Sequence, residues 1–363
     1  MKATEVLKPL GVFVLVIAVI LAGTAVVSTL SGSDSAAPSD GEDIQGQAPE
    51  QFKPENAIAT SAPEDGDISV ESGGEDKRIL VDSSHGNQYS QSEIEPLAQA
   101  LSKAGHEVDF AAGGGSNGGF GSSSYNATLQ QYDAVLIVQP TSSYSDAQIA
   151  GLKAYADAGG RIVALGEPPQ LQVSSGLVAQ VSEVRFGAQD LAEEFGLRLG
   201  SQGVYNMQDD RNDNNYESVV ASPDGDSPLT QGVDNVTFDS AGTVVQTGNG
   251  AQVRLRALPG SKTLDRRQAG QHPVAAQNGN FVLVADTSFL KTSERYDMDN
   301  ERFISNLLEF LVSGDKEEGV PEAGGGMGNG GFGGGDSGGA DGGAGGDGGE
   351  PGGPLTETPT AVP

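Results

Sequence analysis

The 363-residue chain contains no cysteine and only three histidines. The absence of cysteine excludes disulfides, thiolate metal sites, a cysteine nucleophile and a lipid-modified N-terminal cysteine. It also removes any redox clue to the compartment. Basic residues are scarce, with 20 Lys and Arg against 50 Asp and Glu, which gives a formal net charge of -30. Nucleic acid is therefore excluded as a partner, because no basic face could displace counterions from phosphates.

The same charge balance points to the solvent in which the chain folds. Its acidic side chains repel one another in dilute salt, whereas salt at 1 M screens charges over about 3 Å. The acidic excess, the few lysines and the many Thr and Val residues are typical of a halophilic archaeal protein. The alternative is an ordinary acidic protein with acidic tails.

Long apolar runs are confined to one place near the N-terminus. Residues 9–30 read PLGVFVLVIAVILAGTAVVSTL and carry no charge. A spanning helix needs about 20 such residues, whereas a signal-peptide core has about 7–15, so the run predicts a retained transmembrane anchor in the lipid bilayer. Lys2 and Lys8 precede it and acidic residues follow, which predicts a single-pass cell-membrane protein with a cytoplasmic N-terminus, residues 1–8, and an extracellular domain. A cleaved secretory signal, with small residues at 35–37, is the alternative.

Two further segments lack the apolar residues that a core requires. Residues 31–76 are polar and acidic, and residues 315–363 include a long Gly-rich run. Such segments cannot offset their ordering entropy, so both are predicted to be disordered. The remaining part, residues 77–314, has the size of one folded domain.

This central part alternates short apolar strands with amphipathic helices. Strands are predicted at residues 78–82, 106–110, 132–138, 161–166 and 279–286, and helices at 92–104, 145–158, 190–197 and 299–312. The alternation indicates a doubly wound α/β domain with a mostly parallel sheet. Residues 204–234 read as a polar loop, and short alternating runs at 236–258 predict a β-rich insertion.

Three segments carry a family resemblance: ILVDSSHG at 79–86, LKAYADAGGRIVALGE at 152–167, and FVLVADTSFL with DNERFISNLLEFL at 281–311. Together they resemble the uncharacterised domain similar to class I glutamine amidotransferases. That family occurs near MoxR-type ATPases and in auxiliary subunits of gliding-motility ABC transporters, and it is related to the GIFT domain of intraflagellar transport proteins. The resemblance implies a flavodoxin-like sheet and a haloarchaeal, membrane-anchored member with MoxR-associated or ABC-transporter-type membrane partners.

The resemblance does not bring an activity with it. Class I glutaminases place a cysteine on a sharp turn after a strand. This chain has no cysteine, and the strand at 161–166 is followed by Glu167-Pro168-Pro169. Glutaminase chemistry is therefore excluded, and relatives of this kind look like binding or scaffold modules.

Ligands of open α/β sheets lie beyond the carboxyl ends of the strands. Six polar residues are predicted at this edge as ligand-binding candidates: Asp82, Ser84, His85, Glu167, Asp286 and Ser288. The carboxylates and the histidine could bind a cation or do acid–base work. Alternatively, the two aspartates cap their own loops and Glu167 is solvated. No cofactor and no metal are predicted.

Other motifs are weaker. A Ser/His/Asp hydrolase would need Ser83 or Ser84 to reach His85, which adjacent residues in one tight loop rarely do. The acidic loop at 209–214 lacks the Gly and Glu of an EF-hand, so a solvated loop is favoured over calcium. Asn126 and Asn235 stand in N-glycosylation sequons, which an extracellular domain could use.

The sequence leaves two functions open. The first is a non-catalytic extracellular binding or scaffold module of a membrane complex, related to transport or the envelope. The second is a hydrolase or metal-dependent enzyme that uses the strand-end carboxylates and His85. Convergence of Asp82, His85, Glu167 and Asp286 would discriminate between them.

Overall fold

The computed structural model describes residues 65–71, 74–111, 122–174 and 180–320. The chain divides into units Met1–Thr60 and Ser61–Pro363, and every described residue belongs to the second unit. The predicted anchor at 9–30 lies outside the described residues, as do most of the predicted linker and tail. Among the helices of the described ranges, none has the length and apolar character that crossing a bilayer requires.

A ten-stranded mixed sheet forms the centre of the domain, in the order β11-β10-β13-β15-β16-β4-β3-β1-β2, with β9 paired to β10. Its parallel half consists of β2 (Glu107–Ala111), β1 (Arg78–Asp82), β3 (Ala134–Val138), β4 (Arg161–Leu165) and β16 (Phe281–Val284). Its antiparallel half consists of β15 (Pro273–Asn278), β13 (Gln252–Ala257), β10 (Asn215–Pro223), β11 (Val236–Asp239) and β9 (Asn212–Asp213). The parallel half is compatible with the predicted flavodoxin-like arrangement.

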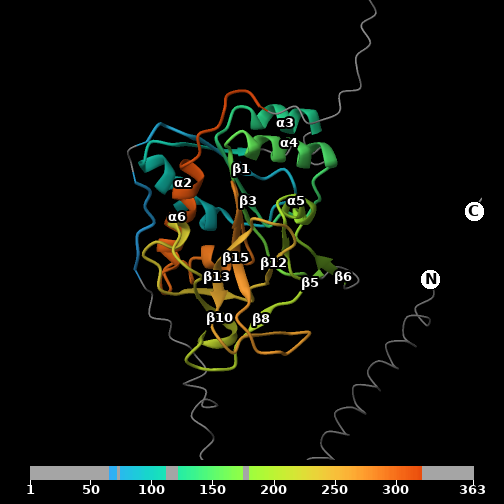
Figure 1. Ribbon diagram of the computed structural model, residues 1–363, viewed down its shortest axis with the longest axis vertical. Coiled ribbons are helices and arrows are strands. Elements are labelled where there is room, and N and C mark those ends of the chain that lie inside the picture. The colour runs from blue at the N-terminus through green and yellow to red at the C-terminus, as the bar shows by residue number, and fades with distance from the viewer. Residues whose placement is uncertain (1–64, 72–73, 112–121, 175–179, 321–363) are drawn as a thin grey trace, which may run out of the picture. The chain divides into compact units, whose positions relative to one another are not determined.

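Helices cover both faces of the parallel half (Figure 1). They are α2 (Gln91–Lys103), α3 (Ser122–Leu129), α4 (Asp146–Asp157), α5 (Gln189–Glu194) and α6 (Asn300–Val312), with short 3-10 helices η2 (Pro228–Thr230) and η3 (Ser288–Leu290). Helices α2 and α6 pack into one apolar cluster, and α3, α4 and α5 pack into a second cluster on the opposite face. All five residues of β3 are buried, which explains its unbroken apolar sequence.

The β-rich stretch after α5 extends this sheet. The prediction of a polar loop at 204–234 was wrong for β10, a nine-residue strand in which Val219, Val220 and Ala221 are buried. Its flanks are rich in Asn and Asp, so its short apolar core gave a weak strand signal. Because β10 pairs with β13, its apolar side chains are covered only after distant segments have come together.

Two helix starts show how local sequence fixes an element. Ser145 begins α4 as predicted, with its side chain accepting the N–H of Gln148. Helix α2 begins earlier than predicted, since Ser90 and not Ser92 is its N-cap. Glu93 accepts the N–H of Ser90 at 2.5 Å, which is half of a capping box, and this pairing selects the earlier serine.

The folded domain also begins before residue 77. Residues 65–71 fall in the predicted linker, yet Ile68 is only 6% exposed and belongs to the core cluster that contains α6. The N–H of Ser69 donates to Ser305 Oγ at 3.1 Å. A short part of the acidic segment therefore packs against the closing helix.

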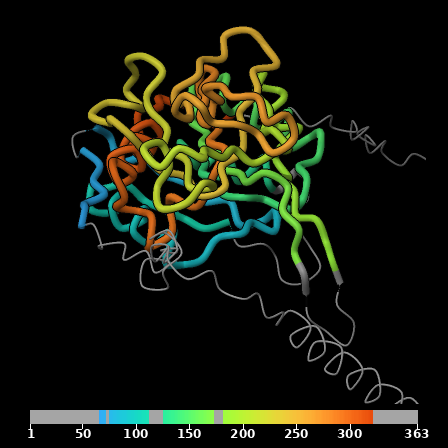
Figure 2. Tube along the Cα trace, turned by 90° about the horizontal axis from the view of Figure 1, so that it is seen from below, coloured from blue at the N-terminus to red at the C-terminus, as the bar shows by residue number. Residues whose placement is uncertain are grey.

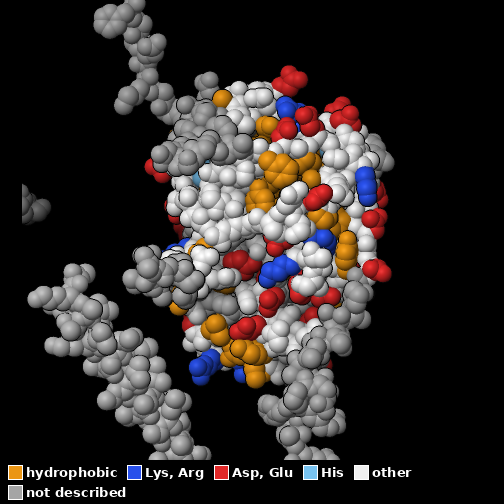
Figure 3. Space-filling view, turned by 180° about the vertical axis from the view of Figure 1, so that it is seen from behind, with side chains coloured by type: hydrophobic (Ala, Val, Ile, Leu, Met, Phe, Trp, Pro, Cys, Tyr) orange, Lys and Arg blue, Asp and Glu red, His pale blue; other side chains and the backbone are white. Residues whose placement is uncertain are grey.

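Three small sheets complete the described domain. They are β5 (Gln170–Ser174) with β6 (Gln180–Val184), β7 (Leu197–Leu199) with β12 (Val244–Gln246), and β8 (Val204–Tyr205) with β14 (Lys262–Thr263). The first is a hairpin that projects away from the rest of the domain, as the two green strands that end in grey in Figure 2. Acidic side chains outnumber basic ones on the face drawn in Figure 3, in keeping with the net charge of -30.

Candidate functional site

The parallel strands β1, β3, β4 and β16 bring their carboxyl ends to one edge of the sheet, which is called the strand-end edge below. Two of these strands end in the same type of turn. The first turn is Asp82-Ser83-Ser84 and the second turn is Asp286-Thr287-Ser288. Of the six predicted site residues, four lie in these turns: Asp82, Ser84, Asp286 and Ser288. His85 directly follows the first turn, and Glu167 lies just after β4.

In the first turn, Asp82 closes the loop with one carboxylate oxygen. Its Oδ1 accepts the N–H of Ser84 at 2.8 Å and the hydroxyl of Ser84 at 2.6 Å. This confirms the prediction that Asp82 caps its own loop. The hydroxyl of Ser84 is thereby committed as a donor to a carboxylate.

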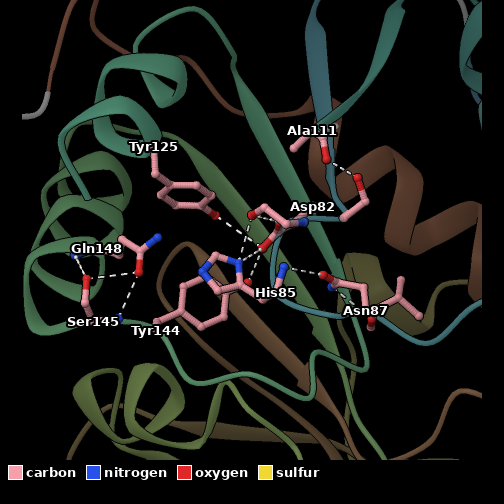
Figure 4. A network of polar contacts seen from close by, with 11 residues as sticks. Asp82, His85, Asn87, Ala111, Tyr125, Tyr144, Ser145 and Gln148 are labelled. Carbon is pink, nitrogen blue, oxygen red and sulfur yellow. Dashed lines mark hydrogen bonds and ion pairs between the residues drawn. The ribbon is translucent and has the colours of Figure 1, made fainter. Parts of the chain in front are cut away.

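The other oxygen of Asp82 is held by three rings (Figure 4). Its Oδ2 lies 2.8 Å from His85 Nδ1 and accepts the hydroxyls of Tyr144 and, at 3.5 Å, Tyr125. Because an ionised carboxylate only accepts, the proton of His85 is on Nδ1. The imidazole stacks on Tyr144 with ring centroids 3.7 Å apart.

The chemical state of Asp82 follows from these contacts. Burial by itself would raise the pKa of this fully buried carboxyl. The hydrogen bond and charge of His85, with hydrogen bonds from Ser84 and Tyr144, outweigh burial and lower the pKa of Asp82 below its ordinary value. Asp82 is therefore an anion in a saturated network.

The second turn repeats the local bonding of the first. Asp286 Oδ1 accepts the N–H of Ser288 at 2.5 Å, the hydroxyl of Ser288 at 2.6 Å and the N–H of Phe289 at 3.3 Å. The predicted capping role of Asp286 is thus also confirmed. Its Oδ2, however, is buried and has no hydrogen-bond partner among the described residues.

Glu167 lies across from the second turn. Its Oε1 accepts the N–H of Thr287 at 2.8 Å and the hydroxyl of Thr287 at 2.5 Å, and its Oε2 is buried without a partner. The residue is 9% exposed, so the expectation that Glu167 is solvated was wrong. The ends of β4 and β16 approach each other here, so Thr287, which follows β16, donates to Glu167, which follows β4. The sequence around β4 alone does not indicate this contact.

Burial shapes the pKa of both acids in this second cluster. Burial raises the pKa of Glu167 above its ordinary value, against the hydrogen bonds from Thr287 and the charge of Lys291. Burial and the nearby charge of Glu167 raise the pKa of Asp286 well above its ordinary value. The pKa values of the two strand-end aspartates are therefore shifted in opposite directions although their turns are alike.

The four side chains that were to decide between enzyme and binding module form two clusters. Asp82 with His85 makes one, and Glu167 with Asp286 makes the other. Among the described residues, no hydrogen bond or ion pair joins one cluster to the other. The sequence correctly placed these residues at one edge, but did not reveal this division.

Gln139, which sequence reasoning passed over as the end of a strand, lies between the clusters. Its Oε1 accepts the N–H of Glu167 at 2.8 Å, and its carbonyl accepts the N–H of Gln88 at 2.9 Å. Its φ of 37° is in the left-handed region, which non-glycine residues rarely adopt and which is frequent at functional sites. Glu167 is not among the described residues with positive φ, so the sharp strand-end turn follows β3 and not β4. The only sequence signal was a polar residue before Pro140, at the end of a buried strand.

A cavity of about 240 Å³ opens at this edge. The strand-end loops and the β5–β6 hairpin line it, through Gln88, Gln139, Glu167, Thr287, Lys291, Gln170, Leu171, Gln172 and Val184. Amide and hydroxyl groups dominate this lining, and Glu167 and Lys291 are its charged members. His85 and the two aspartates are not part of it.

The Ser/His arrangement differs from the expectation in one respect. Ser84 Oγ lies 3.0 Å from His85 Nδ1, so the expectation that these neighbours do not meet was wrong. The contact is nevertheless on the ring nitrogen that faces Asp82. In a Ser-His-Asp triad the serine and the aspartate occupy opposite ring nitrogens. Ser84 is therefore not placed as a nucleophile activated by His85.

The remaining predicted sites have simple outcomes. Asn126 is 6% exposed and donates from Nδ2 to the carbonyl of Ala147 at 2.8 Å, so its burial argues against a glycan there. Asn235 is half-buried, and glycosylation stays a prediction at both sequons. Asp213, from the acidic loop, has a carboxylate oxygen within 4.8 Å of those of Glu294 and Asp297, and all three residues are half-buried.

Similarity to known structures is distant. The N-terminal domain of mmIFT52 is 14% identical, with a TM-score of 0.49, covering 66% of this chain and 99% of that one. A glutamine amidotransferase from Thermotoga maritima is 12% identical, with a TM-score of 0.35, covering 66% of this chain and 99% of that one. An α-L-fucosidase isoenzyme 2 from Paenibacillus thiaminolyticus is 11% identical, with a TM-score of 0.35, covering 65% of this chain and 32% of that one.

No curated protein matches the chain. One protein family matches residues 97–308, which are more than half of the 363 residues. The match spans β2 to α6, and so includes Glu167, Asp286 and Gln139 but not the first turn. The chain belongs to the family described as Domain of unknown function (DUF4350).

Proposed function

We propose that the domain is a non-catalytic binding or scaffold module, amidotransferase-like in descent and flavodoxin-like in its parallel half, that acts in a membrane complex of a halophile. One observation carries this proposal. Every hydroxyl of the two turns is already engaged as a donor: Ser84 to Asp82, Thr287 to Glu167, Ser288 to Asp286, and Ser83 to the carbonyl of Ala111. No such hydroxyl is left poised for attack.

The rest of the edge favours recognition. The cavity is lined mainly by amides and by one threonine, groups that bind a ligand through hydrogen bonds. The predicted anchor at 9–30 would hold the domain outside the cell membrane, where MoxR-associated or ABC-transporter-type membrane proteins are the partners that the family resemblance suggests. The acidic surface would keep the domain soluble in concentrated salt.

Site-directed photo-crosslinking of the full chain in its own membranes, in molar salt, tests this proposal. A photo-reactive residue would replace Gln88 or Gln172 at the strand-end edge, and Gln131, which is exposed before β3 at the opposite edge, serves as the control. We expect one membrane protein to be cross-linked from both strand-end positions and not from Gln131. Absence of any protein adduct at Gln88 and Gln172 would overturn the scaffold role.

The hydrolase alternative is favoured by one feature. Because Asp82 is hydrogen-bonded to Nδ1 of His85, the imidazole has the orientation of a general base. Among the described residues, its Nε2 has no hydrogen-bond partner. Labelling of the full chain by a fluorophosphonate would reveal a nucleophilic serine. We expect no labelling, and labelling that is lost in Ser84→Ala would replace the scaffold proposal with a hydrolase.

A further inference from the structure

The wall of the strand-end cavity has an unusual composition. Gln170, Leu171 and Gln172 all line it, and they are consecutive residues of β5. Side chains of a strand alternate between its two faces, so a single face cannot present three residues in a row. The cavity therefore meets the main chain of β5 as well as its side chains, next to Val184, the residue of β6 that pairs with Gln170.

One edge of β5 is unpaired. Within the part of the chain that the structure describes, β5 pairs with β6 alone, from Gln170 with Val184 to Ser174 with Gln180. Alternate residues of β5 thus direct their N–H and C=O groups away from β6. Such an edge is a template for another strand unless charge, proline or a bulge blocks it.

None of those blocking features occurs on β5. Its sequence, QLQVS, has no charge and no proline, in a chain whose formal net charge is -30. Leu171 is 76% exposed and Val181 of β6 is 66% exposed, so the hairpin presents apolar side chains that nothing described covers. Exposed apolar groups on an otherwise acidic protein mark an interaction surface.

The other walls of the cavity indicate the charge of the occupant. Glu167 lines the cavity and has a carboxylate oxygen without a partner, and the unpartnered oxygen of Asp286 belongs to the same cluster. Lys291 Nζ lies 3.9 Å from Asp239 Oδ2, and this carboxylate offsets the charge of Lys291. A buried polar atom without a partner is destabilising, and a donor from a ligand would remove that penalty.

We propose that the strand-end cavity receives an extended peptide segment of a protein partner, which pairs with the free edge of β5 and directs a basic side chain toward Glu167. The inference deepens the proposed scaffold function and rests on it. Main-chain pairing supplies affinity and the cavity supplies selectivity, as in other cases of strand addition. Gln88, Gln139 and Gln172 add amide groups around the bound segment.

Peptide binding to the full chain in detergent micelles and molar salt tests this proposal. The probes are three fluorescent ten-residue peptides of alternating Val and Thr, with Lys, Leu or Glu at the centre, followed by anisotropy. We expect the Lys peptide to bind at least about tenfold more tightly than the Glu peptide, since a tenfold change in Kd corresponds to about 1.4 kcal/mol. Equal binding of all three, or no binding, would overturn the proposal.

Two variants and a matched control locate the site. Leu171→Lys places a charge on the β5 edge, whereas Val181→Lys places the same charge on β6, at a position that does not line the cavity. We expect Leu171→Lys to weaken binding of the Lys peptide at least about tenfold and Val181→Lys to leave it within about twofold, from the cost of blocking an edge. Glu167→Gln should remove the preference for Lys over Leu. Equal losses in the two hairpin variants would overturn the assignment.

Other occupants give distinct results. A single cationic residue, Nα-acetyl-lysine amide with a free side-chain ammonium group, serves as a further probe. If it binds as tightly as the Lys peptide, the cavity takes a small amine and the peptide proposal fails. If Leu171→Lys instead abolishes self-association of the full chain in sedimentation experiments, the occupant is a second copy. If the cross-linked membrane partner remains attached in Leu171→Lys, this inference fails while the scaffold function stands.

Discussion

The first and second turns have the same local structure, but the pKa values of their aspartates are shifted in opposite directions. In both, one aspartate oxygen accepts the N–H and the hydroxyl of the serine two residues later. In the first turn the other oxygen meets His85 and Tyr144, and the pKa of Asp82 is lowered. In the second turn that oxygen has no partner and Glu167 is nearby, so the pKa of Asp286 is raised.

The turn sequence sets the local backbone structure, and the surrounding residues set the pKa of the aspartate. An Asp followed by a Ser two residues later is enough to form the turn, because the side chain bonds to nearby backbone. The charge of the aspartate depends on which groups the rest of the fold brings to its free oxygen. Similar strand-end motifs in one sheet can therefore have different chemistry.

The largest expected effect comes from neutralising each aspartate in turn. Asp82→Asn removes the anion that His85 and two tyrosine hydroxyls surround, and should lower the free energy of unfolding by about 3 kcal/mol. Asp286→Asn replaces a carboxyl whose ionised form is disfavoured by burial, and should change it by less than about 1 kcal/mol. Denaturant unfolding in molar salt measures both. Equal losses of unfolding free energy would contradict the difference between the two turns.

The pH dependence of stability should have opposite signs at the two turns. The folded pKa of Asp82 is below its ordinary value of 3.8, so its contribution is complete above that value and is lost as pH falls through the folded pKa. The folded pKa values of Asp286 and Glu167 are above 3.8 and 4.5, so their contributions are complete at lower pH and are lost as pH rises.

Unfolding measured as a function of pH checks these signs. Asp82→Asn should remove a decline in stability below about pH 4, with a slope of at most about 1.4 kcal/mol per pH unit. The double variant Asp286→Asn, Glu167→Gln should remove a decline that begins above about pH 4. If the double variant instead steepens that decline, the pKa values of the second cluster are lowered by folding and not raised.

Removal of single tyrosine hydroxyls should have a smaller effect. Tyr144→Phe keeps the ring that stacks on His85 and loses the hydrogen bond to Asp82, which should cost about 2 kcal/mol because the acceptor is charged. Tyr155→Phe is the matched control, since that hydroxyl is buried without a partner. We expect it to be neutral or to stabilise the fold by up to about 1 kcal/mol. Thermal and denaturant unfolding would contradict this account if Tyr155→Phe were the more damaging change.

The smallest effect concerns the two turn serines. Ser84→Ala removes a hydrogen bond to a carboxylate whose pKa is lowered and should cost about 1.5 kcal/mol, whereas Ser288→Ala removes one to a carboxyl whose pKa is raised and should cost about 0.5 kcal/mol. Denaturant unfolding at neutral pH measures the difference. The difference should shrink as the pH falls through the folded pKa of Asp82, which is below 3.8. Costs that are equal at pH 7 would contradict the opposite pKa shifts of the two aspartates.

Much of the parallel half could be predicted from sequence. The runs that form β1, β3, β4 and β16 are apolar because both faces are covered by helices, and their polar ends place the candidate residues at one edge. The antiparallel half was harder. β10 has a short apolar core between polar flanks, and only its pairing with distant strands makes that core buried.

The candidate site shows the same limit. Asp82, His85, Glu167 and Asp286 were predicted from their positions after strands, and the capping of loops by both aspartates was the alternative that their tendency to bond nearby backbone N–H groups offered. Gln139 was missed because neither its positive φ nor its contact with Glu167 leaves a mark in the sequence.

The sequence by itself determined the net charge, the absence of cysteine chemistry, the strand and helix pattern of the parallel half, and the two capped turns. These properties depend on composition or on residues a few positions apart. It takes the three-dimensional fold to separate the acids into two clusters, to lower the pKa of Asp82 while raising that of Asp286, and to bring the β5–β6 hairpin to the border of a cavity. Those outcomes depend on groups far apart in sequence, such as Tyr144 beside Asp82 and Thr287 beside Glu167, because burial and distance set the energy of a charge.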